Sequence, residues 1–138
     1  MIGLDTNVLA RYYIQDAGDG EAAKQREAAR RLMESGKSLM VCKTVLLELE
    51  WVMRGYYKFS KAQITGVMEH LLSLPQVTIE DRVSLVKALS HCAAGLEMAD
   101  ALHHSSYQGC DSMASFDDKQ FARRAQRIGL TPRVGVPL

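Results

Sequence analysis

Cysteine is scarce in this chain, and the few cysteines are widely spaced. Among 138 residues there are three, Cys42, Cys92 and Cys110. No two of them form a CxxC pair and their number is odd, so the sequence suggests neither a zinc knuckle nor a disulfide framework. A reduced, cytoplasmic protein is the simpler interpretation.

Long hydrophobic runs are also missing. The longest apolar region, residues 45–53, is interrupted by Glu48 and Glu50, so we expect no segment that spans a bilayer. Asp5 comes so early that no signal peptide is expected either. The chain has no internal repeat, no Gly/Ser linker and no low-complexity tract, and its length suits one domain, residues 1–138.

No charge of one sign dominates the composition. Apolar residues make up 47% and charged residues 24%, which is typical of a globular protein. The net charge is +1, so composition alone selects neither nucleic acid nor membrane as a partner. An acidic pocket is compatible with this balance if basic residues lie elsewhere.

Short apolar segments alternate with segments of helical periodicity. We expect strands at 2–4, 38–42, 77–79, 113–116 and 130–134, the last at a sheet edge because of Pro132. We expect helices from Thr6 or Asn7 through Tyr13, and at 21–35, 44–57, 61–73, 81–94, 97–107 and 118–128. This alternation predicts an α/β fold: a central, mainly parallel sheet of about five strands, flanked by helices on both faces.

Capping residues mark several of these helices. Thr6 or Asn7 can cap the first, Ser60 the fourth and Asp81 the fifth. The fifth helix is expected to bury an apolar stripe of Val83, Leu85, Val86 and Leu89. The Gly and Asp content of residues 16–20 favours a loop.

Two acids follow predicted strands. Asp5 ends the first strand and Asp117 ends the fourth, and the carboxyl ends of parallel strands share one rim, where ligands bind. If these strands are neighbours, the two carboxylates face each other. Either Asp117 or Asp118 must cap the last helix. Asp117 is closer to the strand end, so we expect its side chain at the rim. We expect Asp118 to stabilise the first turn of the helix.

Glu48 lies on a predicted helix in apolar surroundings. Glu50, on the same helix, has Arg54 four residues on, which predicts a surface ion pair contributing ~0.5 kcal/mol. Glu48 instead has Trp51 and Val52 ahead of it, and a carboxylate there is costly unless a cation satisfies it. Simple exposure of Glu48 is an equal alternative.

Asp100 also lies within a predicted helix, although Asp is a mediocre helix former there. Glu97 precedes it by one turn, and His103 and His104 follow it. A surface Asp paired with a histidine, or a late cap, explains Asp100 as well as a functional role does.

The four acids together suggest a metal site. If Asp5, Glu48, Asp100 and Asp117 converge on one rim, their charges repel unless some stay protonated or a cation binds. Oxygen ligands with several waters suit Mg²⁺ or Mn²⁺. Such an ion polarises a phosphate oxygen and activates water for phosphodiester hydrolysis.

Four motifs, in chain order, resemble those of PIN-domain ribonucleases, and most closely those of VapC-type toxins of bacterial toxin–antitoxin pairs. They are Leu4-Asp5-Thr6-Asn7-Val8-Leu9, Thr44-x-x-x-Glu48-Leu49-x-Trp51-Val52, Ala99-Asp100-Ala101-Leu102-His103 and Ser115-Phe116-Asp117-x-x-Phe121. The resemblance covers nearly the whole chain, and its specificity lies in the order of the four motifs.

The resemblance implies a role for each matched residue. The four acids match the family's acidic quartet, Thr6 and Asn7 its polar residues after the first acid, and Ser115 its Ser/Thr before the last. It implies a Mg²⁺- or Mn²⁺-dependent endoribonuclease acting on RNA, usually a homodimer, inhibited by a cognate antitoxin that often places a basic side chain in the acidic pocket. Ser115 stands where Thr is commoner, and the Gly18-Asp19-Gly20 loop is glycine-rich.

Other interpretations of the acidic pocket stay open. A phosphatase or phosphotransferase could use Asp5 as nucleophile, although Asn7 stands where its second acid is expected. A receiver-like module could use Glu80 or Asp81 after the third strand, which leaves Glu48 and Asp100 unexplained. A PIN fold that only binds is a third alternative, and an intact quartet argues against it.

Basic and aromatic side chains offer possible RNA contacts, with ordinary packing or solvation as the alternative. Possible phosphate ligands are Arg11, Lys43, Arg123, Arg124 and Arg127. Possible base-stacking residues are Tyr12, Tyr13, Tyr56 and Tyr57.

Overall fold

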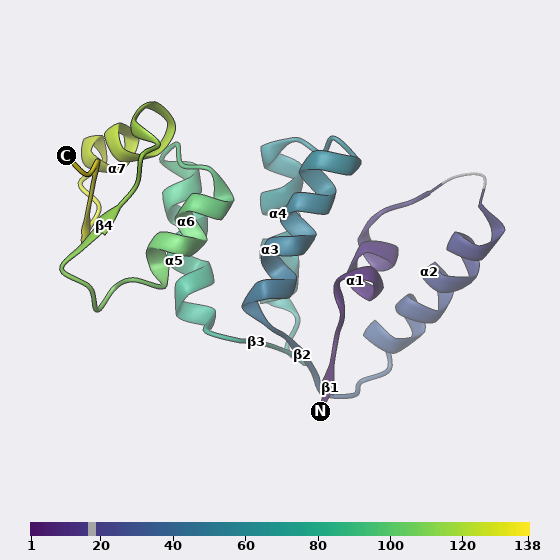
Figure 1. Cartoon of the computed structure of the whole chain (residues 1–138). Coiled ribbons are helices and arrows are strands. Elements are labelled where there is room, and N and C mark those ends of the chain that lie inside the picture. Colours follow the sequence, from purple (N-terminus) through teal and green to yellow (C-terminus); the bar gives the residue numbers. More distant parts are fainter. Residues whose placement is uncertain (17–18) are drawn as a thin grey trace. The chain divides into compact units, whose positions relative to one another are not determined.

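A computed structural model describes residues 1–16 and 19–138, which form two compact units, Met1–Arg82 and Val83–Leu138. We call them the N-terminal unit and the C-terminal unit. Figure 1 labels most of their helices and strands.

The N-terminal unit contains a parallel three-stranded sheet in the order β1-β2-β3. The strands are β1 (Ile2–Gly3), β2 (Leu39–Val41) and β3 (Val77–Ile79), which lie side by side in Figure 1. Ile2 is paired with Leu39, which is paired with Val77. Because all strands run the same way, the segments that follow them, including Asp5, leave from one edge of this sheet.

Helices connect the strands of the N-terminal unit. They are α1 (Thr6–Tyr13), α2 (Gly20–Met33), α3 (Lys43–Trp51), the π-helical segment η1 (Val52–Tyr56) that continues α3, and α4 (Lys61–Ser73). Helix α1 packs against α2 and α3. Fully buried apolar side chains from these helices form the core, among them Leu9, Met33, Leu46, Leu49 and Met68.

The C-terminal unit pairs a small sheet with helices. Its helices are α5 (Arg82–Ala93), α6 (Met98–Ser105), the π-helical segment η2 (Asp118–Ala122) and α7 (Arg123–Arg127). Its strands, β4 (Ser112–Ala114) and β5 (Arg133–Gly135), are parallel. Phe121 and Val134 are buried, as is His104, whose Nε2 lies 2.8 Å from the carbonyl oxygen of Pro132.

The predicted α/β class with parallel strands is confirmed, but the predicted single sheet of about five strands is wrong. The described strands form two sheets, of three and two strands. Each strand is only two or three residues long. Strand pairing depends on where the connecting helices pack, which periodicity along the chain does not specify.

Half of the predicted buried stripe of the fifth helix is wrong. Val83 and Val86 are 65% and 49% exposed. Helix α5 instead buries Leu85 with the smaller side chains Ser84, Ala88 and Cys92. These residues recur with the helical period, so the tertiary contacts selected the face with small residues rather than the face with more valines.

Helix ends agree better with local signals. Ser60 caps α4, as predicted, and forms a capping box with Gln63. Gly36 adopts the left-handed conformation (φ +80°) just beyond α2. The predicted helix 44–57 divides into α3 and η1, and of the predicted loop 16–20, Ala17 and Gly18 lie outside the described residues.

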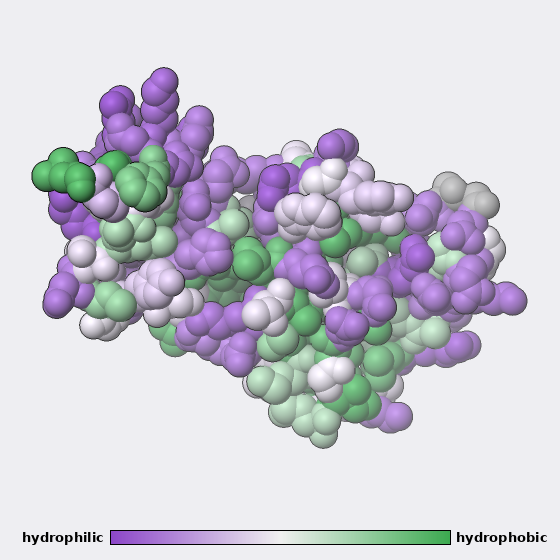
Figure 2. Space-filling model, in the orientation of Figure 1, coloured by the Kyte–Doolittle hydropathy of each residue, from purple (hydrophilic) through white to green (hydrophobic). Residues whose placement is uncertain are grey.

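Within the described residues, every helix is too short or too polar to cross a membrane. Figure 2 shows a largely hydrophilic surface, with apolar surface near the end where Figure 1 places the N-terminus. Met1 and Ile2 are exposed there, and Trp51 and Tyr56 of the same unit are exposed as well.

Candidate functional site

Asp5 lies between β1 and α1 and uses one of its carboxylate oxygens to cap the helix. Its Oδ1 accepts a hydrogen bond from the backbone N of Thr6 at 2.8 Å, so Asp5 is the N-cap of α1. The prediction that Thr6 or Asn7 caps this helix is wrong, because the helix already begins at Thr6. Among the described residues, Asp5 Oδ2 has no hydrogen-bond partner, and the buried hydroxyl of Thr6 has none.

Asp5 and Glu48 line the same cavity of the N-terminal unit, which has a volume of about 390 Å³. Its lining comes from α1, α2, α3 and η1: Asp5, Thr6, Asn7, Ala10, Arg11, Gln25, Glu48, Val52 and Tyr57. The fold therefore brings together four residues that the sequence predicts to act in one site. We call this space the acidic cavity.

Arg11 is the cation of the acidic cavity. Its Nε donates to Gln25 Oε1 at 2.8 Å, and its Nη1 lies 3.7 Å from Asp16 Oδ2. The Tyr57 hydroxyl donates to the same Asp16 oxygen at 3.4 Å, and burial followed by the charge of Asp16 raises the pKa of Tyr57. Sequence reasoning named Arg11 as a possible phosphate ligand, but no local pattern pointed to Gln25 or Tyr57 as cavity residues.

The two glutamates of α3 differ in burial: Glu50 is buried, and Glu48 is exposed, which is one of the two alternatives left open by the sequence. Glu50 pairs with Arg54 at 2.7 Å as predicted, but its side chain is only 4% exposed, so the prediction of a surface pair is wrong. Glu48 is exposed and has no ion-pair partner among the described residues. Tertiary packing, rather than the neighbours in sequence, decides which face of α3 is covered.

Asp100 and Asp117 influence each other within the C-terminal unit. Asp100 is half-buried on α6. Burial raises the pKa of its carboxyl, and the negative charge of Asp117 raises it further, whereas His103 lowers it. A cation bound beside these carboxylates would remove the electrostatic penalty on the ionised form of Asp100.

Asp117 is held by its neighbours in sequence. Its backbone N donates to Ser115 Oγ at 3.1 Å, and its Oδ1 accepts from the Gln120 backbone N at 3.0 Å. Asp117 is therefore the N-cap of η2. Asp118 lies in the first turn, as predicted, and pairs with Arg123 at 2.8 Å.

The donor set of each unit suits a hard divalent cation. All candidate ligands are carboxylate oxygens, which Mg²⁺ and Mn²⁺ prefer over the nitrogen and sulfur ligands of zinc. No group of three or more His, Cys, Asp or Glu side chains is placed to hold a metal within residues 1–16 and 19–138. A pair of carboxylates would leave most coordination positions of the ion to water or substrate, which is how Mg²⁺ is usually bound in proteins.

Comparison with known proteins adds no family assignment. The chain matches no protein-family model, and a search of curated proteins finds no significant relative.

Proposed function

We propose that this protein is a Mg²⁺- or Mn²⁺-dependent endoribonuclease of the PIN type that hydrolyses RNA phosphodiester bonds. The observation that carries the proposal is the acidic cavity, which Asp5 and Glu48 both line although they lie far apart in the sequence. The electrostatic coupling of Asp100 and Asp117 in the C-terminal unit supports the same assignment.

The acidic cavity contains the parts that phosphodiester hydrolysis needs. A divalent ion supplies, when bound, polarisation of the phosphate and activation of a water molecule. Asp5 Oδ2 and the Glu48 carboxylate are the ligands offered by the N-terminal unit. Arg11, kept in place by Gln25, binds a phosphate oxygen and offsets negative charge as it develops.

We propose that Asp100 and Asp117 form a second pair of metal-binding carboxylates, within the C-terminal unit. Capping of η2 and the hydrogen bond to Ser115 restrict the position of Asp117, so it is preorganised as a ligand. Burial and the charge of Asp117 raise the pKa of Asp100, so a cation bound beside this carboxyl would offset the electrostatic cost of its ionised form.

The biological setting that we propose is that of a cytoplasmic toxin of a type II toxin–antitoxin pair, acting as a homodimer and inhibited by its cognate antitoxin. Exposed Met1, Ile2, Trp51 and Tyr56 provide apolar surface for protein partners. A basic antitoxin side chain would pair with Glu48, which has no ion-pair partner among the described residues.

Cleavage of total RNA by purified protein tests the proposal. We expect cleavage with Mg²⁺ or Mn²⁺, loss of cleavage with a chelator, and loss in each of the variants Asp5→Asn, Glu48→Gln, Asp100→Asn and Asp117→Asn. Glu69→Gln and Asp111→Asn are the matched controls, because both acids are exposed and lie outside the two acidic pairs. Metal-dependent cleavage that survives in Asp5→Asn would refute the site, and a stable phospho-Asp adduct formed with acetyl phosphate would favour phosphotransfer instead.

A further inference from the structure

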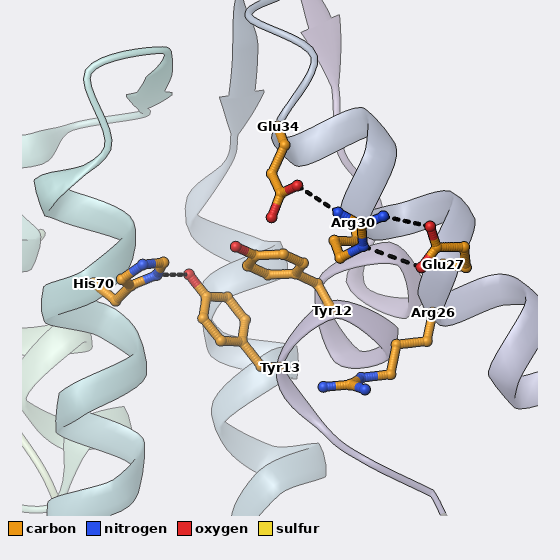
Figure 3. A pocket seen from close by; sticks show the side chains of 7 residues that line it. All are labelled: Tyr12, Tyr13, Arg26, Glu27, Arg30, Glu34 and His70. Carbon is orange, nitrogen blue, oxygen red and sulfur yellow. Dashed lines mark hydrogen bonds and ion pairs between the residues drawn. The ribbon is translucent and has the colours of Figure 1, made fainter.

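A second cavity of the N-terminal unit combines aromatic rings with two arginines. It has a volume of about 390 Å³ and is lined by Tyr12, Tyr13, Arg26, Glu27, Arg30, Glu34 and His70. Figure 3 shows these side chains, which come from α1, α2 and α4. We call this space the tyrosine cavity. Its volume is within the range of small-ligand sites.

Tyr13 and His70 form a fixed wall of the tyrosine cavity. The Tyr13 hydroxyl lies 2.6 Å from His70 Nδ1, and the two rings pack edge to face at 5.5 Å. Burial raises the pKa of Tyr13, so its hydroxyl stays protonated and available for this hydrogen bond. The polar groups of these two side chains are therefore used by each other rather than by a ligand.

Tyr12 is the ring left for a ligand. Its edge-to-face contact with Tyr13 (4.9 Å between centroids) and its stacked contact with His70 (6.5 Å) hold the ring in place. Its hydroxyl has no hydrogen-bond partner among the described residues. A half-buried, oriented ring of this kind offers a platform on which a nucleobase stacks.

The two arginines of the tyrosine cavity differ in their partners. Arg30 is neutralised by two carboxylates: its Nε lies 3.0 Å from Glu27, its Nη2 also bonds Glu27, and its Nη1 lies 2.7 Å from Glu34. Arg26 has no hydrogen-bond or ion-pair partner in the part of the chain that the structure describes, and Figure 3 draws it without a contact. An unpaired guanidinium beside an aromatic ring is suited to a phosphate.

We propose that the tyrosine cavity binds one nucleotide, with its phosphate on Arg26 and its base against Tyr12. That the nucleotide belongs to a single-stranded RNA rests on the proposed nuclease function. Asp5 and Tyr12 lie near opposite ends of α1, about 10 Å apart along the helix axis. A strand cleaved at the acidic cavity therefore reaches the tyrosine cavity within a short stretch of backbone.

Fluorescence anisotropy with a short, labelled single-stranded RNA of mixed sequence tests the proposal. Divalent metal is left out, so that binding is measured without cleavage. We expect Tyr12→Leu to weaken binding about tenfold through lost stacking, and Tyr12→Phe to bind as the natural protein does. We expect Arg26→Gln to weaken binding and to lower the slope of log affinity against log salt by about 0.7, because one phosphate contact is lost.

The controls are an arginine and a tyrosine outside the tyrosine cavity. Arg31→Gln removes a charge from an exposed position of α2, and Tyr107→Leu removes a ring of the C-terminal unit that is 46% exposed. Both are expected to bind RNA within about twofold of the natural protein. Arg26 is itself exposed, so Arg26→Gln tests the proposal even if Tyr12→Leu does not fold.

The outcomes separate this proposal from the nuclease function. Equal RNA binding by Arg26→Gln and the natural protein, or equal losses in the controls, would overturn the nucleotide site whether or not the protein cleaves RNA. RNA binding that depends on Tyr12 and Arg26 in a protein that never cleaves would support the site and refute the nuclease. Calorimetric titration with adenosine and uridine 5′-monophosphates tests whether the site binds a free nucleotide instead of RNA. If these nucleotides bind and RNA does not, and if their binding depends on Tyr12 and Arg26, the site would be assigned to a free nucleotide.

Discussion

Replacing Asp5 by Asn and by Ala separates its helix-capping role from its proposed catalytic role. Asp5 Oδ1 accepts the Thr6 backbone hydrogen bond at 2.8 Å, and the Asp5 side chain is exposed, so capping is its main contribution to stability. Asn caps a helix as well as Asp does, whereas Ala costs about 1 kcal/mol. We therefore expect Asp5→Asn to unfold within ~0.3 kcal/mol of the natural protein and Asp5→Ala to lose about 1 kcal/mol.

RNA cleavage, unlike stability, should be lost in both Asp5 variants. Both variants lose the carboxylate, so we expect both to lose RNA cleavage by about 100-fold or more, equivalent to ~2.7 kcal/mol of transition-state stabilisation. Urea unfolding followed by circular dichroism measures the first effect, and RNA cleavage with Mn²⁺ measures the second. The two assays together show whether activity and stability separate at this residue.

Asp19 provides the matched control. It caps α2 in the same way, accepting a hydrogen bond from the Glu21 backbone N at 3.0 Å, and it lies outside the acidic cavity. Asp19→Ala should lose about 1 kcal/mol of stability and keep its cleavage activity. The reasoning is refuted if Asp5→Asn cleaves RNA normally, or if Asp5→Asn loses as much stability as Asp5→Ala.

Three further predictions concern buried and half-buried charges. Burial and a neighbouring carboxylate raise the pKa of Asp100, so the folded protein loses stability as pH rises through that pKa. In urea unfolding at pH 7, Asp100→Asn should therefore be more stable than the natural protein, by less than about 1 kcal/mol. The same variant should be inactive on RNA. An unfolding free energy equal to or below that of the natural protein would contradict this. Burial, and then a neighbouring histidine, lower the pKa of His91 from 6.5, so the free energy of unfolding should fall as pH falls below about 6.5. His91→Gln should make the free energy of unfolding depend less steeply on pH in this range. An unchanged pH dependence would contradict this prediction. Arg54→Met leaves the buried Glu50 carboxylate without this ion pair and should cost about 2 kcal/mol, most of it recovered when Glu50→Met is added; a loss near zero would show that Glu50 does not need the pair.

Local signals predicted the ends of helices well. The Ser60–Gln63 capping box and the left-handed Gly36 involve only neighbouring residues, so the sequence contains all the information that they need. The strand at Val77–Ile79 was predicted for the same reason. The cap of α1 was misplaced by one residue, because Asp5, Thr6 and Asn7 are all competent caps and local sequence does not choose between them.

Burial was harder to predict. On α3 the sequence left the burial of Glu48 open and predicted an exposed Glu50, whereas the structure has an exposed Glu48 and a buried Glu50. On α5 the valine-rich face is exposed. In both helices the covered face depends on which other element packs there, and periodicity describes the faces of a helix without specifying its neighbour.

The sequence by itself determined the α/β class, most helix ends and the identity of the acids, because these follow from residue type and short-range spacing. It also singled out Asp5 at the end of β1, where a chain leaving a parallel sheet presents a side chain. Only the tertiary structure decided that Asp5 and Glu48 share a cavity with Arg11, that the strands form two sheets, and that Tyr12 and Arg26 meet in a second cavity. These are contacts between residues distant in sequence, and they exist only once the helices have packed on one another.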